Sequence, residues 1–297
     1  MSQIFFWQAV VLRQISNVSV FNKIFVYVRD YSKETVEHII LFTGIYMLLC
    51  IILYMGMVRC QKPQFNSAVT WARRVLIVTA HPDDECMFFG PTILNLLKDG
   101  NCTVYILCLT TGCNYGMGRI RKTELYRACR TLGINSDNIT VKSHSLLPDY
   151  LTARWPIEIV EKLVLQEVET YDIDTIITFD KYGVSSHPNH CTIFYGIANL
   201  CLEEVLPKDC AIYVLETVNI LRKYILIFDI PLSLLFSRTR YFVNSSERSI
   251  IHRAMKQHKS QLIWFRWLYI YFSRYMLINT LHKLDLMDIQ FELDLEI

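Results

Sequence analysis

The sequence lacks several features that would assign it to a common class of protein. Its 30 Lys and Arg residues are nearly balanced by 28 Asp and Glu residues, so the formal net charge is only +2. The basic residues are also scattered rather than gathered into one stripe, which argues against a nucleic-acid-binding protein. There is no internal repeat and no low-complexity tract. We therefore expect a globular chain with no nucleic-acid partner.

Paired cysteine spacings are also absent. None of the 10 cysteines forms a Cys-x-x-Cys pattern, and several fall inside predicted helices or strands: Cys86, Cys102, Cys108 and Cys129. This pattern is typical of reduced thiols that pack as small hydrophobic side chains. It favours a cytosolic location for the part of the chain that carries them.

One segment lacks charge altogether. Residues 39–58, from Ile39 to Val58, contain no charged side chain, and a helix of that length spans the roughly 30 Å hydrocarbon core of a bilayer. A buried core helix usually shows some polar face, whereas only Thr43 and two glycines interrupt this segment. We therefore predict a single transmembrane helix here.

The flanks of this helix suggest its orientation. Basic residues are slightly more frequent after it than before it: Lys23, Arg29 and Lys33 precede it, and Arg59, Lys62, Arg73 and Arg74 follow it. The positive-inside rule then places the C-terminal domain on the cytoplasmic side of the membrane. Residues 59–74 have the composition of a linker. Apolar runs within residues 1–38, such as Ile4–Leu12, either lie on the membrane or are disordered.

Short apolar runs then alternate with helical patterns. Strands are predicted at Val75–Thr79, Thr103–Thr110, Ile139–Lys142, Thr175–Phe179 and Ala211–Leu215. Helices are predicted at Cys86–Lys98, Arg121–Leu132, from Pro156 to about Thr170, and Cys191–Leu202. This alternation predicts an α/β fold over residues 75–220, with βαβ units, a mainly parallel sheet and helices on both faces.

Residues 221–297 differ in composition and are assigned to the same domain. Two apolar, aromatic segments, Tyr224–Phe236 and Leu262–Leu277, are interrupted by Asp229, Pro231, Arg266 and Arg274, so neither is predicted to span a membrane. One interpretation is a packing layer of the domain core. The other is a face that lies on the membrane surface, where Trp, Tyr and Arg are common. The two interpretations are compatible.

Two clusters of polar residues follow predicted strands. His81, Asp83 and Asp84 come directly after the first strand, and a second cluster follows Thr175–Phe179: Asp180, His187, Asn189 and His190. Ligands of parallel sheets collect at the carboxyl ends of the strands, so the two clusters are expected to meet in space. Each cluster alone would be explained by a solvated turn and a helix cap. Their shared position favours a metal site.

The residue types suit a catalytic zinc ion. Imidazole and carboxylate are ligands that Zn²⁺ takes when one position stays open for water, so His81, Asp84 and His190 are the predicted ligands. Asp83 beside them would act as general base, and His187 would stabilise an oxyanion or protonate a leaving amine. The other histidines weighed, His38, His252, His258 and His282, are interpreted as ordinary surface residues.

The same residues resemble a known family. AHPDDE at Ala80–Glu85 and HPNH at His187–His190 resemble the paired motifs of the PIG-L/LmbE-like de-N-acetylases, metal-dependent enzymes with a Rossmann-like fold. Three further stretches resemble this family, two of them its membrane-anchored eukaryotic branch: GMGRIRKTEL at Gly116–Leu125, and FDKYGVSSHPNH and HKSQLIWFRWLYIYFSRYMLIN, which end at His190 and Asn279. The resemblance covers roughly Val75 to Asn279. One departure is the glycine loop, GCNYGMG, where Cys113 and Tyr115 replace the family's common Asn and Asp.

The resemblance implies the same roles for the same residues: zinc ligands at His81, Asp84 and His190, a base at Asp83 and an assisting histidine at His187. It adds Arg121 as a contact to substrate phosphate or sugar. It also implies a lipid-linked glycan, N-acetylglucosaminyl-phosphatidylinositol, as substrate, deacetylated at the endoplasmic reticulum membrane in an early step of glycosylphosphatidylinositol (GPI) anchor synthesis.

The sequence leaves three other functions to consider. The first is deacetylation of a soluble N-acetylglucosaminyl conjugate, which would leave the predicted transmembrane helix unexplained. The second is a catalytically silent scaffold of the same fold, although no predicted ligand is missing. The third is a nucleotide-binding protein, which would need a GxGxxG turn after the first strand, and the sequence has none there.

Overall fold

The computed structural model describes residues 2–59, 72–98, 100–112, 116–150, 153–285, 287 and 289–290, and for residues 2–21 and 24 the backbone only. The chain divides into two compact units, residues 1–52 and residues 53–297. The predicted linker at residues 59–74 falls mostly on residues 60–71, which lie outside the described residues. Cys113 and Tyr115 of the glycine loop lie outside them as well.

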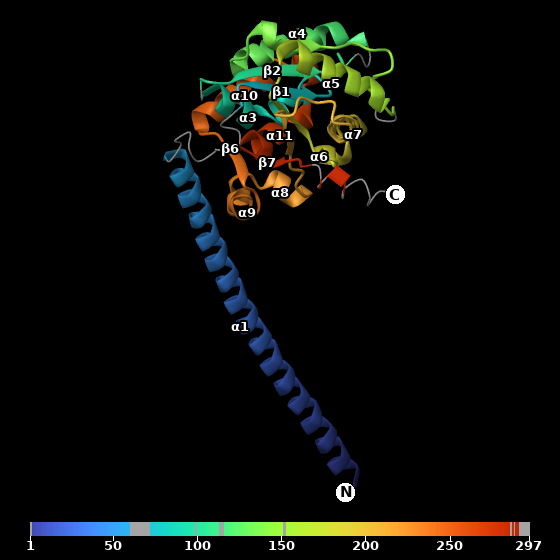
Figure 1. Cartoon of the computed structure of the whole chain (residues 1–297). Coiled ribbons are helices and arrows are strands. Elements are labelled where there is room, and N and C mark those ends of the chain that lie inside the picture. Colours follow the sequence, from blue (N-terminus) through green and yellow to red (C-terminus); the bar gives the residue numbers. More distant parts are fainter. Residues whose placement is uncertain are drawn as a thin grey trace. The chain divides into compact units, whose positions relative to one another are not determined.

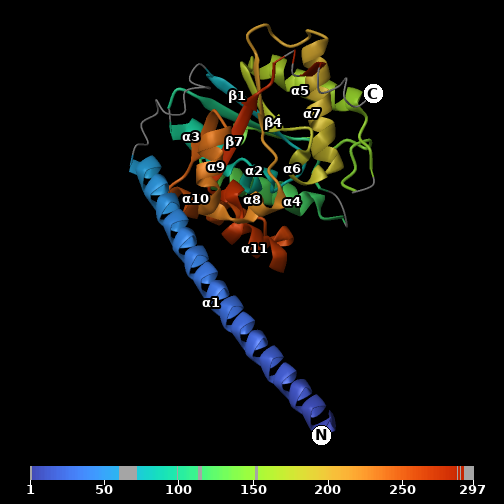
Figure 2. The same cartoon turned by 90° about the horizontal axis from the view of Figure 1, so that it is seen from below.

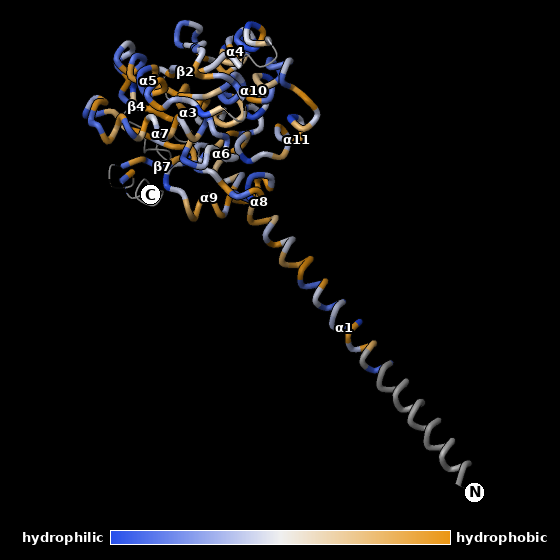
Figure 3. The backbone as a smooth tube through the Cα atoms, turned by 90° about the vertical axis from the view of Figure 1, so that its right-hand side faces the viewer, coloured by the Kyte–Doolittle hydropathy of each residue, from blue (hydrophilic) through white to orange (hydrophobic). Residues whose placement is uncertain are grey.

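The N-terminal part is a single helix, α1 (Ser2–Arg59). Its segment Phe25–Arg59 is long and apolar enough to cross a membrane, and its most apolar stretch is almost entirely exposed. Figure 3 colours the backbone of this helix by hydropathy, with hydrophobic residues in orange. The predicted transmembrane residues 39–58 lie inside this segment, and the same helix includes residues 2–38, for which the sequence left membrane contact or disorder open.

The domain is built on a sheet of seven strands in the order β3-β2-β1-β4-β5-β7-β6 (Figure 1). Five strands are parallel: β1 (Arg74–Thr79), β2 (Thr103–Cys108), β3 (Ile139–Val141), β4 (Thr175–Phe179) and β5 (Ala211–Leu215). They match the five predicted strands closely. Because β1 has β2 on one side and β4 on the other, the strand order reverses at β1, and such a switch point is where open α/β sheets bind ligands.

Helices cover both faces of the sheet, as predicted (Figure 2). One layer contains α5 (Ile157–Tyr171) and α7 (Pro188–Leu202), and the other contains α3 (Gly90–Lys98), α4 (Gly118–Leu132) and α10 (Ser245–Met255). The predicted helix Cys86–Lys98 is wrong in one respect, because the structure divides it into α2 (Asp84–Met87) and α3. Pro91 belongs in the first turn of a helix, since its ring lacks an N–H and clashes with a preceding helical turn.

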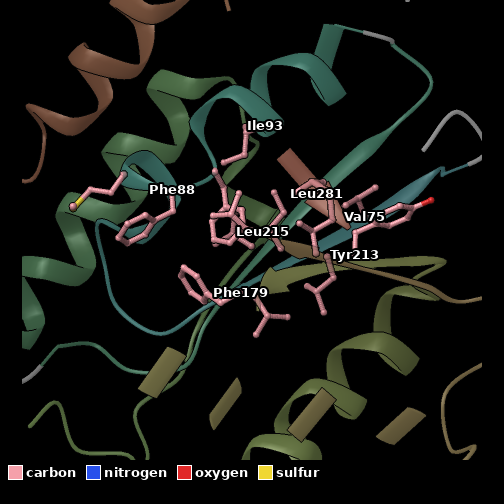
Figure 4. Close-up of a cluster of buried hydrophobic side chains, with 14 of the residues drawn as sticks. Val75, Phe88, Ile93, Phe179, Tyr213, Leu215 and Leu281 are labelled. Carbon is pink, nitrogen blue, oxygen red and sulfur yellow. The ribbon is translucent and has the colours of Figure 1, made fainter. Parts of the chain in front are cut away.

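The core lies between the sheet and these layers. Strands β1 and β4 are apolar and β-branched, and their side chains are almost completely buried. Figure 4 shows Phe88, Ile93, Phe179 and Leu215 gathered in this core. Each fully buried side chain of this size contributes about 1.5–3 kcal/mol through the hydrophobic effect. The core therefore fixes the strand ends on which the polar clusters stand.

The C-terminal part completes the same sheet. Strands β6 (Thr239–Phe242) and β7 (Ile278–Lys283), which the sequence did not predict, pair antiparallel with each other, and β7 pairs antiparallel with β5. The charges that interrupt the two apolar segments pair in the interior: Arg274 Nε lies 3.0 Å from Asp229 Oδ2, and both side chains are fully buried. The packing-layer interpretation therefore holds for this inner side.

Four short helical elements lie along these segments. They are α8 (Ile220–Tyr224), the 3-10 turn η4 (Leu226–Asp229), α9 (Ile230–Phe236) and α11 (Trp264–Phe272). Another short 3-10 turn, η5 (Lys259–Gln261), stands directly before α11. Through η5 and α11 the C-terminal part reaches the ends of the parallel strands.

Candidate metal centre and active site

The turn after β1 presents two adjacent carboxylates. Asp84 Oδ2 accepts hydrogen bonds from the backbone N–H groups of Ala80 (3.0 Å) and His81 (2.8 Å), which folds the chain back on itself. Asp83 takes a positive φ of 117°, and its N–H donates to Glu85 Oε2 over 3.0 Å. A positive φ is uncommon for a non-glycine residue and often occurs at functional sites. Both aspartates are buried as a result.

The segment after β4 is held by one carboxylate. Asp180 Oδ1 accepts from the N–H groups of Tyr182 and Gly183, both over 3.1 Å, and its Oδ2 accepts from Thr217 N over 2.6 Å. Val184, which follows Gly183, has a backbone φ of 65°, and this value is an outlier for a β-branched residue. Asp180, predicted as part of the second polar cluster, therefore shapes the loop.

His190 is oriented by this loop. Its Nδ1 lies 3.1 Å from Gly183 O, to which it donates, and its ring stacks on Phe179 with centroids 3.9 Å apart. Gly183 has a φ of 53°, and a Cβ there would lie 2.8 Å from the Cβ of His190. A proton on Nδ1 leaves Nε2 with a free lone pair, the usual arrangement of a metal-binding histidine.

The two clusters meet as expected. His190 Nε2 lies 3.2 Å from Asp84 Oδ2, and His81 Nδ1 lies 3.7 Å from the same oxygen. The rings of His81 and His187 are 4.8 Å apart, as are those of His187 and His190. The candidate ligand nitrogens of the three histidines all lie within 4.8 Å of one another. The structure therefore brings all five residues of the predicted centre together.

The arrangement fits a divalent metal. When Nδ1 carries the only ring proton, His190 Nε2 and Asp84 Oδ2, 3.2 Å apart, are both acceptors, and a cation between them would satisfy both. His190 Nε2 and His187 Nδ1 are buried and have no hydrogen-bond partner among the described residues. Two imidazoles and a carboxylate match the donor set of catalytic metal sites. The pKa of Asp84 lies well below its usual range, because His190 and His81 outweigh the effect of burial.

His81 is anchored on its other side. Its Nε2 lies 3.1 Å from Asp149 Oδ1 and 2.9 Å from the amide of Asn189. Burial opposes a charge on His81, but Asp149 and Asp84 together raise its pKa to about 9. A proton on Nε2 satisfies Asp149 and leaves Nδ1 facing Asp84. A metal would therefore bind His81 in competition with a second proton.

Asp83 has the environment of a general base. Its side chain is 3% exposed, and Oδ2 lies 2.7 Å from the Arg266 guanidinium. Burial raises the pKa of Asp83 above its usual value, and Arg266 limits this rise. A carboxylate with a raised pKa accepts protons better near neutral pH.

His187 lies on the other side of the centre and stays neutral. Burial is the main reason that its pKa falls to about 4, and the neighbouring imidazoles of His190 and His81 lower it further. A neutral imidazole still offers one N–H to a developing negative charge. This environment suits oxyanion stabilisation better than proton donation.

Arg121 is held by four acceptors. Its NH1 donates to Gly112 O (3.1 Å) and Asp149 Oδ2 (2.6 Å), and its NH2 donates to Pro82 O (3.4 Å) and Gln261 Oε1 (2.5 Å). Its side chain is 13% exposed. His81 and Arg121 together lower the pKa of Asp149 to about 2 although burial acts against them. Arg121 thus fixes an ionised Asp149 next to His81.

Sequence reasoning missed several residues of this site. Asp149, Gln261 and Arg266 were not predicted, and the interpretation of His258 as an ordinary surface residue is wrong. His258 is fully buried, with Nε2 2.7 Å from Glu85 Oε1. Burial lowers its pKa, but Glu85 outweighs this effect and raises it. The HKSQ stretch that opens the last quoted motif was a signal for both residues: Gln261 lines the pocket, and His258 pairs with Glu85, which stands just after Asp83 in the sequence.

Residues of both polar clusters, together with Asp149, Gln261 and Arg266, line one open pocket of about 1150 Å³. Its inner end is polar and contains the metal-type centre with Asp149 and Arg121. Its outer end is apolar and comes from the C-terminal part, with Tyr224 from α8 and Phe265, Leu268 and Phe272 from α11. The volume exceeds the usual range of about 300–1,000 Å³ for small-molecule sites. The pocket thus offers a polar group access to the centre along an apolar wall.

Comparison with known proteins identifies the family. Residues 76–201 match the family model PIG-L, described as GlcNAc-PI de-N-acetylase. The N-acetylglucosaminyl-phosphatidylinositol de-N-acetylase of Bos taurus is 42% identical over 227 residues, which cover 76% of this chain and 89% of that protein. The chain belongs to the PIG-L family. The probable enzyme of the same name from Schizosaccharomyces pombe is 39% identical over 216 residues, covering 70% of this chain and 86% of its own.

Solved structures agree on the fold of this PIG-L chain. The N,N'-diacetylchitobiose deacetylase of Pyrococcus horikoshii superposes with a TM-score of 0.54 at 17% identity and covers 79% of this chain and 92% of its own. A deacetylase of the teicoplanin biosynthesis pathway gives 0.51 at 12% identity, with 71% and 99% covered. The Rossmann-like α/β fold expected from the sequence is therefore confirmed.

Proposed function

We propose that this PIG-L chain hydrolyses the acetamide of N-acetylglucosaminyl-phosphatidylinositol, giving glucosaminyl-phosphatidylinositol and acetate in GPI-anchor biosynthesis. One observation carries the proposal: His81, His187 and His190 bring ring nitrogens within 4.8 Å of one another, with Asp84 Oδ2 3.2 Å from His190 and Asp83 beside it, at the polar end of a pocket with an apolar mouth. The names of the relatives supply the substrate. A soluble sugar conjugate would leave the apolar mouth without a role.

His81, Asp84 and His190 would hold the metal, and we take it to be zinc because of this donor set. When bound, it polarises the acetamide carbonyl and lowers the pKa of a nearby water to about 7. Asp83 accepts the proton of the attacking water, whose oxygen adds to the carbonyl carbon. His187 donates its N–H to the carbonyl oxygen as negative charge develops there.

The second half of the reaction breaks the carbon–nitrogen bond. Asp83 returns the proton to the leaving nitrogen, so that acetate and the free amine of glucosamine are released. Asp149, held in its ionised form by Arg121, is placed next to the centre to accept hydrogen bonds from sugar hydroxyls. Arg121 thereby contributes to substrate binding through Asp149.

The cellular location is part of the proposal. We place the protein in the endoplasmic reticulum membrane as a single-pass protein, anchored through Phe25–Arg59, with its catalytic domain on the cytoplasmic side. Support comes from the length and composition of that helix. The eight cysteines in the described part of the chain are all free thiols, which agrees with a reducing compartment.

The test is acetate release from N-acetylglucosaminyl-phosphatidylinositol by the purified full chain in detergent. Release should stop with a chelator and return with zinc, and Asp83→Asn should lower kcat by about 10²–10⁴-fold, the usual contribution of a general base. Metal content should stay unchanged in this variant. A folded, metal-loaded protein that releases no acetate from this lipid, but does so from a soluble conjugate, would overturn the proposed substrate.

A further inference from the structure

The exposed apolar side chains of the domain are concentrated in its C-terminal part. Within the described residues 72–290, 11 of the 18 large hydrophobic side chains that are exposed belong to α8, α9, α11 and the residue before α11. Six of them lie outside the lining of the active-site pocket and form what we call the C-terminal apolar surface: Ile220, Leu221, Leu235, Phe236, Trp264 and Tyr271. Trp264 is 74% exposed and Leu221 is 76% exposed. Such a concentration marks an interaction site.

The helices that carry this surface are neighbours. Helix α11 contacts α8, α8 contacts η4, and η4 contacts α9. Helix α11 divides its side chains between three environments. Ile270 is buried in the core, Phe265 and Leu268 line the pocket, and Trp264 and Tyr271 are exposed. The C-terminal apolar surface is therefore continuous with the mouth of the active site.

Basic residues greatly outnumber acidic residues in this region. Residues 218–284 contain 11 of the chain's 30 Lys and Arg residues but only two of its 28 Asp and Glu residues. Those two, Asp229 and Glu247, are 0% and 7% exposed. Arg274 is buried against Asp229. Five of the 11 basic residues are exposed, namely Arg238, Arg253, Lys256, Lys259 and Lys283. The exposed charge of residues 218–284 is therefore basic, and it lies in a region with exposed aromatic rings. Anionic lipid headgroups attract such a surface, and Trp and Tyr prefer the boundary between lipid and water.

A basic side chain stands at the pocket mouth itself. The Lys223 ammonium lies 5.9 Å from the ring centroid of Tyr224 and 5.8 Å from that of Tyr269. Within the described residues it forms no ion pair with a carboxylate. A lipid phosphate at the mouth would meet this ammonium, because it lies between the C-terminal apolar surface and the polar end of the pocket.

We propose that the C-terminal apolar surface docks on the headgroup region of an anionic bilayer. The pocket then opens at the plane of the membrane, where a lipid-linked sugar enters while its acyl chains stay in the bilayer. The entry of a lipid-linked sugar rests on the proposed function, whereas the docking itself does not. A second copy of the chain is a poorer occupant, because a symmetric contact would bring two basic regions together.

The first test measures contact with lipid directly. The full chain is reconstituted into vesicles of phosphatidylcholine and phosphatidylinositol, with and without brominated acyl chains that quench nearby tryptophan. The difference between wild type and Trp264→Phe isolates Trp264, which should lose about half of its emission if it lies at the membrane interface. Trp155, isolated in the same way with Trp155→Phe, is 4% exposed and should keep its emission. Equal emission of Trp264 in both kinds of vesicle, with or without self-association of the chain, would overturn the proposal.

The second test separates docking from chemistry. Leu221→Glu with Trp264→Glu should lower kcat/KM by about tenfold on lipid substrate embedded in vesicles and by less than about twofold on a dissolved short-chain analogue. Ile157→Glu with Val205→Glu makes the same charge change at exposed sites outside the surface and should leave both rates unchanged. An equal loss on both substrates would contradict docking. If the wild type deacetylates neither substrate, the proposed function fails, and the quenching experiment still decides the docking.

Discussion

The parallel half of the sheet and the C-terminal part differ in composition and in what they contribute. The parallel half supplies the candidate ligands and the candidate base after buried, β-branched strands, and Asp149 from an irregular segment. The C-terminal part has an antiparallel edge, an excess of basic residues and an exposed apolar surface. We infer that the parallel half carries out the chemistry and that the C-terminal part of the same domain presents the substrate.

Among the polar contacts between the two regions, three join residues in or beside the centre to the C-terminal part. Glu85 pairs with His258 at 2.7 Å, Arg121 bonds to Gln261 at 2.5 Å, and Asp83 pairs with Arg266 at 2.7 Å. Each contact joins a residue of the parallel half to a residue between Met255 and Phe272. Disturbing each in turn shows how far the centre depends on the C-terminal part.

The largest effect is expected for the buried pair of Glu85 and His258. Glu85→Ala removes one partner of a fully buried ion pair and also the acceptor of the Asp83 N–H, so it should lower the free energy of unfolding by about 3–5 kcal/mol. Denaturant unfolding of the full chain in detergent measures this. Asp172→Asn, which breaks an ion pair with an 85% exposed carboxylate, should cost at most about 1 kcal/mol. Equal losses in the two variants would refute the structural importance of the pair.

A smaller effect, on kcat/KM, is expected when Gly112, which leaves room for the Arg121 side chain, is replaced. Gly112 has a φ of 66°, and a Cβ there would lie 2.3 Å from the Arg121 guanidinium, so Gly112→Ala must displace Arg121 and with it Asp149. A misplaced substrate contact costs up to about 10²-fold in kcat/KM, and the metal content should not change. Gly133→Ala is the matched control, because Gly133 also has a positive φ, but a Cβ there meets only Leu97 at 3.5 Å. A control as inactive as Gly112→Ala would point to folding instead.

The smallest effect is a shift in pH dependence. Arg266 holds down the pKa of Asp83 against burial, so Arg266→Met should raise this pKa. The base must be ionised to accept a proton, and the acidic limb of kcat/KM should therefore move to higher pH, by about one unit. Arg253→Met removes an exposed arginine of α10 and should leave the profile in place. An unchanged profile for Arg266→Met would show that Asp83 does not titrate in the reaction.

Much of the parallel half could be predicted from the sequence. Its strands are short β-branched runs, and the polar residues directly after β1 and β4 had to lie at equivalent strand ends. Because β1 and β4 are neighbours in the sheet, His81 and His190 meet although they are far apart in the chain. The break between α2 and α3 was missed because the apolar pattern continues across it.

The C-terminal contribution could not be predicted in the same way. His258, Gln261 and Arg266 stand in or beside short turns, where no period of apolar residues indicates which side faces inward. Arg274 and Asp229 looked like interruptions of apolar segments, yet they pair with each other in the interior. Asp149 lies in an irregular segment whose direction depends on Arg121. Only the tertiary structure brings these residues to the centre.

The most direct test of the account counts the metal. Elemental analysis of the full chain, purified in detergent and equilibrated with zinc, should find about one ion per chain, as expected for a single centre. His81→Ala and His190→Ala, which each remove one ligand from a different strand end, should both lose it, whereas His252→Ala in α10 should keep it. A wild-type chain without metal, or a His190→Ala variant that retains it, would contradict the joining of the two strand ends in one metal centre.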